Sequence, residues 1–120
     1  NNPSEKTIDF FADESADILL TNVINYPNPF TNETRFGFTN NKSGEILEVQ
    51  INIFDINGRL IRSLENKVNT ESNYRSSISW DGRDYNGSPI PAGFYSYLIT
   101  VTDRFGNKTT QHQKLIKIND

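Results

Sequence analysis

The chain has 120 residues, of which 34% are hydrophobic and 22% are charged, and its formal net charge is −3. That length suits one domain. The charges are spread along the chain, so no basic run indicates nucleic-acid binding. No apolar run approaches the roughly 18 residues that a membrane-spanning helix needs. The absence of cysteine excludes disulfides, thiolate metal ligands and a cysteine nucleophile.

The N-terminal residues differ in pattern from the rest of the chain. The sequence opens at NNPSEK without a signal peptide, so we expect a fragment of a longer protein. Residues 7–11, TIDFF, are a candidate strand, and residues 13–20, DESADILL, are the best candidate for a helical turn. We predict that residues 1–20 are an N-terminal extension or the end of a preceding domain. Residues 21–120 would form the main domain.

Further along the chain, hydrophobic residues recur with a period of two, which is typical of strands with one buried face. The predicted strands are ILLTNVINY (18–26), ETRFGFTN (33–40), ILEVQINIFDI (46–56), RLIRSL (59–64), YRSSISW (74–80), FYSYLITVTD (94–103) and TTQHQKLIKI (109–118). Turn signals separate them about every 8–12 residues, a spacing that predicts an all-β fold, an antiparallel immunoglobulin-like β-sandwich of about seven strands.

Local signals refine this prediction. Phe54 changes the face on which the apolar residues of its strand fall, which indicates a bulge. Asn57-Gly58 follows, and this dipeptide between apolar runs predicts a hairpin. Residues 66–76 are polar without a period and are predicted to be a loop.

The stretch WDGRDYNGSPIPAGFYSY (80–97) places acidic residues among glycines and is tested as a calcium loop. An EF-hand with Gly87 at its sixth position would have glycine at its first and twelfth positions, where oxygen ligands are required. We therefore expect Asp81 and Asp84 to accept backbone N–H bonds in turns. Weak ion binding at these two carboxylates stays open.

No arrangement of residues indicates an enzyme. His112 is the only histidine and lies in a predicted strand, and no G-x-S-x-G motif is present. We expect no catalytic residue, no cofactor and no metal site. Six aromatic residues lie in or beside loops: Tyr26, Phe30, Tyr74, Tyr85, Phe94 and Phe105. Most are expected to close the ends of the sandwich, and one or two to form a docking surface.

Four segments in order carry a family resemblance: YPNPFTNETRFGF, VQINIFDINGRLIRSL, WDGRDYNGSPIPAGFYSYLI and a terminal KLIKI. Together they cover residues 23–118. The chain resembles the immunoglobulin-like C-terminal domains of Bacteroidetes proteins handled by the type IX secretion system. Within that group it is most similar to the C-terminal end of the gingipain-like sortases. It is also similar to the immunoglobulin-like domain of flagellar hook-capping proteins.

The sortase resemblance implies a docking or sorting domain of a larger secreted protein. Such a domain binds an outer-membrane partner of the β-barrel type or another secretion component, so the implied location is the cell surface or the outer membrane. The peptidase cysteine of that family has no counterpart here. We expect a monomer that docks through its last strand, by Lys114, Leu115, Ile116, Lys117 and Ile118. The alternatives are a hook-cap-like assembly module and a carbohydrate-binding accessory domain.

Overall fold

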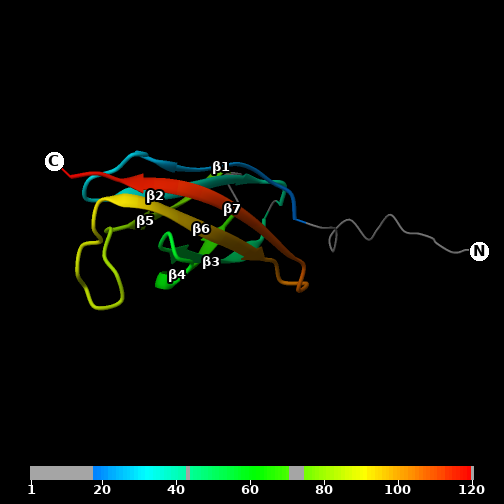
Figure 1. The fold of residues 1–120 in the computed structure, drawn as a ribbon. Helices are drawn as coiled ribbons and strands as arrows, with labels where there is room; N and C mark the ends of the chain where they lie inside the picture. The colour runs from blue at the N-terminus through cyan, green and yellow to red at the C-terminus, as the bar shows by residue number, and fades with distance from the viewer. Residues whose placement is uncertain (1–17, 43, 71–74, 120) are drawn as a thin grey trace, which may run out of the picture.

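The computed structural model describes residues 18–42, 44–70 and 75–119 and shows a sandwich of two antiparallel sheets (Figure 1). A three-stranded sheet has the order β1-β2-β5, and a four-stranded sheet has the order β4-β3-β6-β7. The strands are β1 Leu20–Tyr26, β2 Thr34–Asn40, β3 Ile46–Phe54, β4 Leu60–Asn69, β5 Arg75–Trp80, β6 Gly93–Thr102 and β7 Lys108–Lys117. The predicted all-β sandwich is confirmed. The described part of the chain contains no helix that could cross a membrane.

The alternating pattern buries one face of each sheet. In β3 the four residues Leu47, Val49, Ile51 and Ile53 are almost completely buried. The inward residues of the other strands complete this core, including an aromatic cluster in which Phe36 lies 4.6 Å from Tyr97 and 6.1 Å from Trp80 between ring centroids. Burying aromatic area on this scale compensates for the modest hydrophobic content of the chain.

Local predictions are mostly confirmed, with one correction. The register of β3 against β4 shifts between Ile53 and Phe54, which is the predicted bulge, and the hairpin at Asn57-Gly58 is present. The predicted loop at 66–76 is wrong at its start, because β4 continues to Asn69. Its polar residues face solvent on an edge strand, where few apolar residues are needed. The expected strand at 7–11 lies outside the described residues.

Three turns share one five-residue design that begins with Asp55, Asp84 or Asp103. In each, Oδ1 of the aspartate accepts the N–H groups two and four residues later, at 2.9–3.0 Å. The residue three positions on is a glycine, with φ between +80° and +87°. Glycine adopts this conformation without a steric penalty, and the pattern is that of a type I turn followed by a bulge. The spacing D-x-x-G therefore repeats at three points of the chain.

Candidate functional site

The outer edge of β7 is the site at which the sequence predicts docking, and part of this edge is already paired. The N–H group of Ile116 donates to Oδ1 of Asn28 at 3.0 Å, and its carbonyl accepts from the N–H group of Phe30 at 3.0 Å. The N–H group of Ile118 donates to the carbonyl of Phe30 at 2.9 Å. Residues 28–30 thus lie along the last third of β7 as a short parallel addition to the sheet.

The five predicted docking residues are placed in different environments. Leu115 is fully buried in the core and Lys117 is largely buried, whereas Lys114 and Ile118 are exposed. Ile116 is half-buried on the outer face of the sheet. The structure therefore separates this stretch into inward and outward residues, and only the outward ones offer side chains to a partner. Partner binding by these residues stays a prediction.

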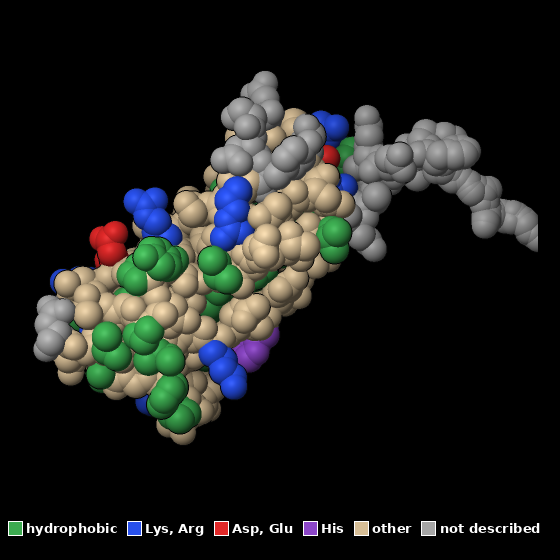
Figure 2. Space-filling model, turned by 90° about the horizontal axis from the view of Figure 1, so that it is seen from above, with side chains coloured by type: hydrophobic (Ala, Val, Ile, Leu, Met, Phe, Trp, Pro, Cys, Tyr) green, Lys and Arg blue, Asp and Glu red, His purple; other side chains and the backbone are tan. Residues whose placement is uncertain are grey.

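Ile116 and Ile118 belong to a larger group of hydrophobic surface residues, which we call the C-terminal patch. It consists of Tyr26, Pro27, Pro29, Phe94, Ile116 and Ile118. Phe94 pairs directly with Ile116 across β6 and β7, and the segment with both prolines is held to β7 through Asn28. Figure 2 shows hydrophobic side chains gathered at the end of this face that lies away from the N-terminus. Large exposed apolar patches on protein surfaces commonly take part in interactions with other molecules.

The aromatic residues near loops do not behave as expected. Phe30 closes the sandwich, since it is 1% exposed and its ring lies 5.7 Å from that of Trp80. Tyr26, Tyr85, Phe94 and Phe105 are exposed, so the prediction that most of these residues are caps is wrong for them. Tyr74 lies outside the described residues. Two of the exposed aromatics, Tyr26 and Phe94, belong to the C-terminal patch.

The glycine-rich loop after β5 is built from turn interactions, as predicted. Asp81 accepts the N–H group of Arg83 at 3.1 Å, and Asp84 accepts those of Asn86 and Ser88. Gly82 packs so closely that a β-carbon would lie 2.9 Å from the carbonyl oxygen of Asn32. Among the described residues, no three acidic or histidine side chains converge as metal ligands would.

Two buried polar groups affect the electrostatics of the core. Burial alone would raise the pKa of Asp103, but hydrogen bonds from Asn107 and Phe105 and the charge of Lys42 lower it overall. Nζ of Lys42 lies 3.6 Å from Oδ2 of Asp103 within the protein. Burial raises the pKa of Tyr97 to about 12. Its hydroxyl has no hydrogen-bond partner among the described residues.

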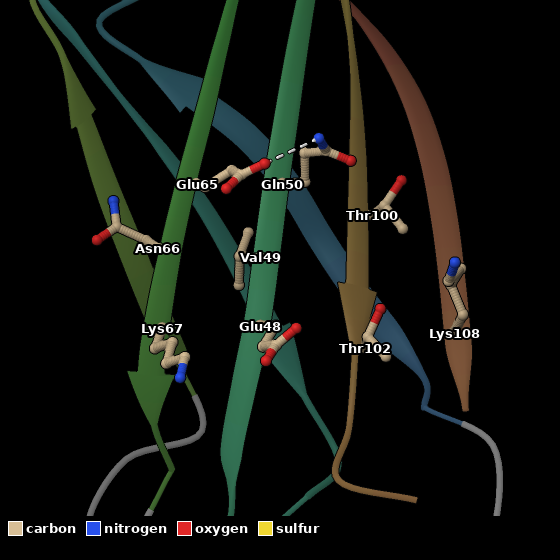
Figure 3. A pocket seen from close by; sticks show the side chains of 9 residues that line it. All are labelled: Glu48, Val49, Gln50, Glu65, Asn66, Lys67, Thr100, Thr102 and Lys108. Atoms are coloured by element: carbon tan, nitrogen blue, oxygen red, sulfur yellow. Dashed lines mark hydrogen bonds between the residues drawn. The ribbon is translucent and has the colours of Figure 1, made fainter. Parts of the chain in front are cut away.

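A polar groove of about 530 Å³ lies on the outer face of the four-stranded sheet, at the end opposite the C-terminal patch (Figure 3). It is lined by Glu48, Val49, Gln50, Glu65, Asn66, Lys67, Thr100, Thr102 and Lys108. Nε2 of Gln50 donates to Oε2 of Glu65 at 3.3 Å. Small-molecule sites are mostly lined by apolar and aromatic side chains, and this lining is almost entirely polar. His112 is exposed on the same face.

Comparison with known proteins gives one family match. Residues 22–104 match the model of the FlgD Ig-like domain. No curated protein matches the chain in sequence.

Solved structures share the fold. The dimeric latent PorU from Porphyromonas gingivalis is 32% identical, with a TM-score of 0.74 over 88% of this chain and 10% of that one. PorZ from the same organism, an essential bacterial surface component of the type IX secretion system, is 20% identical over 82% of this chain, with a TM-score of 0.51. The hook-capping protein FlgD from Xanthomonas campestris is 24% identical over 83% of this chain and 68% of its own, with a TM-score of 0.55. The chain spans about a tenth of the length of PorU and of PorZ.

Proposed function

The chain belongs to the FlgD Ig-like domain family, and from that premise we propose that it is a docking domain of a larger type IX secretion protein. Domains of this type are typically non-catalytic. The likeness to PorU supports the choice of secretion system, because it combines 32% identity with agreement of the fold. The domain would attach its parent protein to an outer-membrane component, a β-barrel or another part of the secretion machinery. The parent would then act at the cell surface.

The observation that carries this proposal is the C-terminal patch. Phe94 is 67% exposed and Tyr26 is 75% exposed, although large aromatic side chains are usually well buried. Phe94 pairs with Ile116, within the residues where docking is predicted, and Tyr26 precedes the segment that Asn28 holds to β7. Because Asn28 and Phe30 occupy the backbone groups of Ile116 and Ile118, the partner would contact side chains at this end of β7 and would not add a strand there.

The test changes the surface and keeps the fold. Deleting the chain from Lys114 onward removes Leu115 from the core, so a loss of docking would not be distinguished from unfolding. The double substitution Phe94→Ser with Ile116→Thr leaves the buried face intact. We expect the parent protein carrying it to remain folded but to be lost from the cell surface and from pull-downs with outer-membrane components.

The matched control is Ile56→Ser, which removes an equally exposed hydrophobic side chain in the turn after β3, outside the patch. This control should retain surface attachment. Normal attachment of the Phe94→Ser, Ile116→Thr protein, with an unchanged melting temperature, would refute docking through the C-terminal patch.

A further inference from the structure

The opposite edge of the four-stranded sheet, β4, has outward backbone groups that the described part of the chain does not pair. Two bonds define which residues point outward. The N–H group of Thr70 donates to the carbonyl of Glu45 at 2.8 Å, so even-numbered residues bond toward β3. The carbonyl of Ile61 instead accepts from the N–H group of Tyr85 at 3.1 Å, on the outer side. Since the direction alternates along an antiparallel strand, the backbone groups of Ser63, Glu65 and Lys67 point away from the sheet.

This edge carries a charge pattern that is complementary to itself. Glu65 and Lys67 are two residues apart, so their side chains lie on the same face of β4, beside the polar groove (Figure 3). Leu64 and Val68 are half-buried on the other face. When a second β4 strand is turned by 180° and placed alongside the first, the negative charge of one strand lies next to the positive charge of the other.

We propose that β4 pairs antiparallel with β4 of a second copy of this chain, which extends the four-stranded sheet across a two-fold axis. The axis passes by Asn66, which faces Asn66 of the partner subunit. Glu65 then lies opposite Lys67 of the partner subunit, and the symmetry repeats this pair. On the inner face Leu64 lies opposite Val68 of the partner subunit. The Glu65–Lys67 and Leu64–Val68 pairs are stabilising, and the two-fold interface contains each of them twice, whereas the Asn66 pair on the axis occurs once.

Neighbouring registers are disfavoured by the same two residues. If the pairing shifts by two residues in one direction, Glu65 lies opposite Glu65 of the partner subunit. If it shifts in the other direction, Lys67 lies opposite Lys67 of the partner subunit. Like charges directly opposite each other destabilise a strand pair. A single charge would only discourage pairing at an edge. The alternation of Glu65 and Lys67 disfavours the two shifted registers and favours the register centred on Asn66.

The test uses charge reversal in the 120-residue chain, followed by sedimentation equilibrium. The unchanged chain should associate reversibly as a weak dimer, as expected of an interface below about 1,200 Å². Glu65→Lys and Lys67→Glu each place like charges opposite each other twice, so each variant alone should lose about tenfold or more in association constant. An equimolar mixture of the two variants should associate at least as well as the unchanged chain, because every cross-strand pair is then between opposite charges.

Lys108→Glu is the matched control, since it reverses an exposed charge on the same outer face at the other edge of the sheet. It should leave association unchanged. The proposal is overturned if the unchanged chain stays monomeric up to about 1 mM, or if the mixture of the two folded variants associates no better than each alone. Surface attachment of the parent depends on other residues, so failure here leaves the docking proposal intact.

Discussion

The two edge strands of the four-stranded sheet, β7 and β4, differ in whether their outward backbone groups are hydrogen-bonded. At β7, residues 28–30 cross from the neighbouring sheet and take up the groups of Ile116 and Ile118. At β4 no described residue pairs with the outward groups near Glu65, and the side chains there alternate in charge. Where a sheet edge is covered by the chain itself, a partner can contact only its side chains. At an open edge, a partner can also add a strand through backbone hydrogen bonds. The same sheet thus offers two surfaces of different chemistry.

The largest expected effect comes from removing the buried ring of Phe30, which belongs to the segment that covers the end of β7. Phe30→Ala should lower the free energy of unfolding by about 3–5 kcal/mol, because a fully buried ring next to Trp80 is lost and a cavity remains. Urea unfolding measures this loss. Phe105→Ala, which removes an exposed ring, is the control and should change stability little. A loss below about 1 kcal/mol for Phe30→Ala would show that this residue does not hold the β7 edge closed.

The core between the two edges should respond to alkaline pH through Tyr97, which lies in β6. Its pKa rises to about 12 in the folded chain because its hydroxyl is buried, against 10.0 for the free side chain. The unfolded chain therefore loses this proton first, and stability falls as pH rises from about 10 towards 12, by roughly 2–3 kcal/mol.

Urea midpoints between pH 9 and pH 11.5 would measure this slope. In Tyr97→Phe the tyrosine contribution should disappear, and stability at pH 7 should be retained, since the hydroxyl has no partner among the described residues. An unchanged slope in Tyr97→Phe would mean that other groups cause the alkaline loss.

A smaller effect is expected from Asn28, whose side chain bonds to the backbone of β7. Asn28→Ala removes the acceptor of the Ile116 N–H group and should cost about 1 kcal/mol. Hydrogen exchange at the amide of Ile116 should become faster, while that of Tyr97 in the central strand should not. Equal exchange rates at Ile116 in both proteins would contradict the role of Asn28 in closing this edge.

The smallest effect is expected at the open edge. In dilute solution, where the chain is monomeric, Glu65→Lys should change the free energy of unfolding by less than about 0.5 kcal/mol. The side chain is exposed, and its bond to Gln50 is long, at 3.3 Å. Thermal unfolding at low and high protein concentration separates this monomer effect from association. A loss above about 1 kcal/mol in dilute solution would show that β4 contributes to the monomer in a way that its contacts do not indicate.

Sequence reasoning worked where the information is local. The alternation in β3 identified its buried residues, and Asn57-Gly58 identified the hairpin. It failed at residues 66–69, because an edge strand that faces solvent needs only Leu64 and Val68 as apolar residues, so the period is diluted. The aromatic residues near loops were also misjudged, since burial depends on which segments lie above them.

The candidate site shows the same division. Residues 114–118 were predicted from their position in the last strand, and Phe94 was noted as an aromatic next to a loop. The contact that defines this surface joins Asn28 to Ile116, which are 88 residues apart in the chain, and no local pattern indicates it.

The sequence by itself determined the strands, the turns and the two-sided character of the sheets, since these depend on the alternation of side chains and on glycine, asparagine and aspartate at fixed spacings. The tertiary structure decided which sheet edge is covered and which is open. That outcome depends on the path of residues 28–30 between the two sheets, where backbone groups far apart in sequence satisfy each other's hydrogen bonds. The C-terminal patch and the open β4 edge both follow from that path and from the order of the strands.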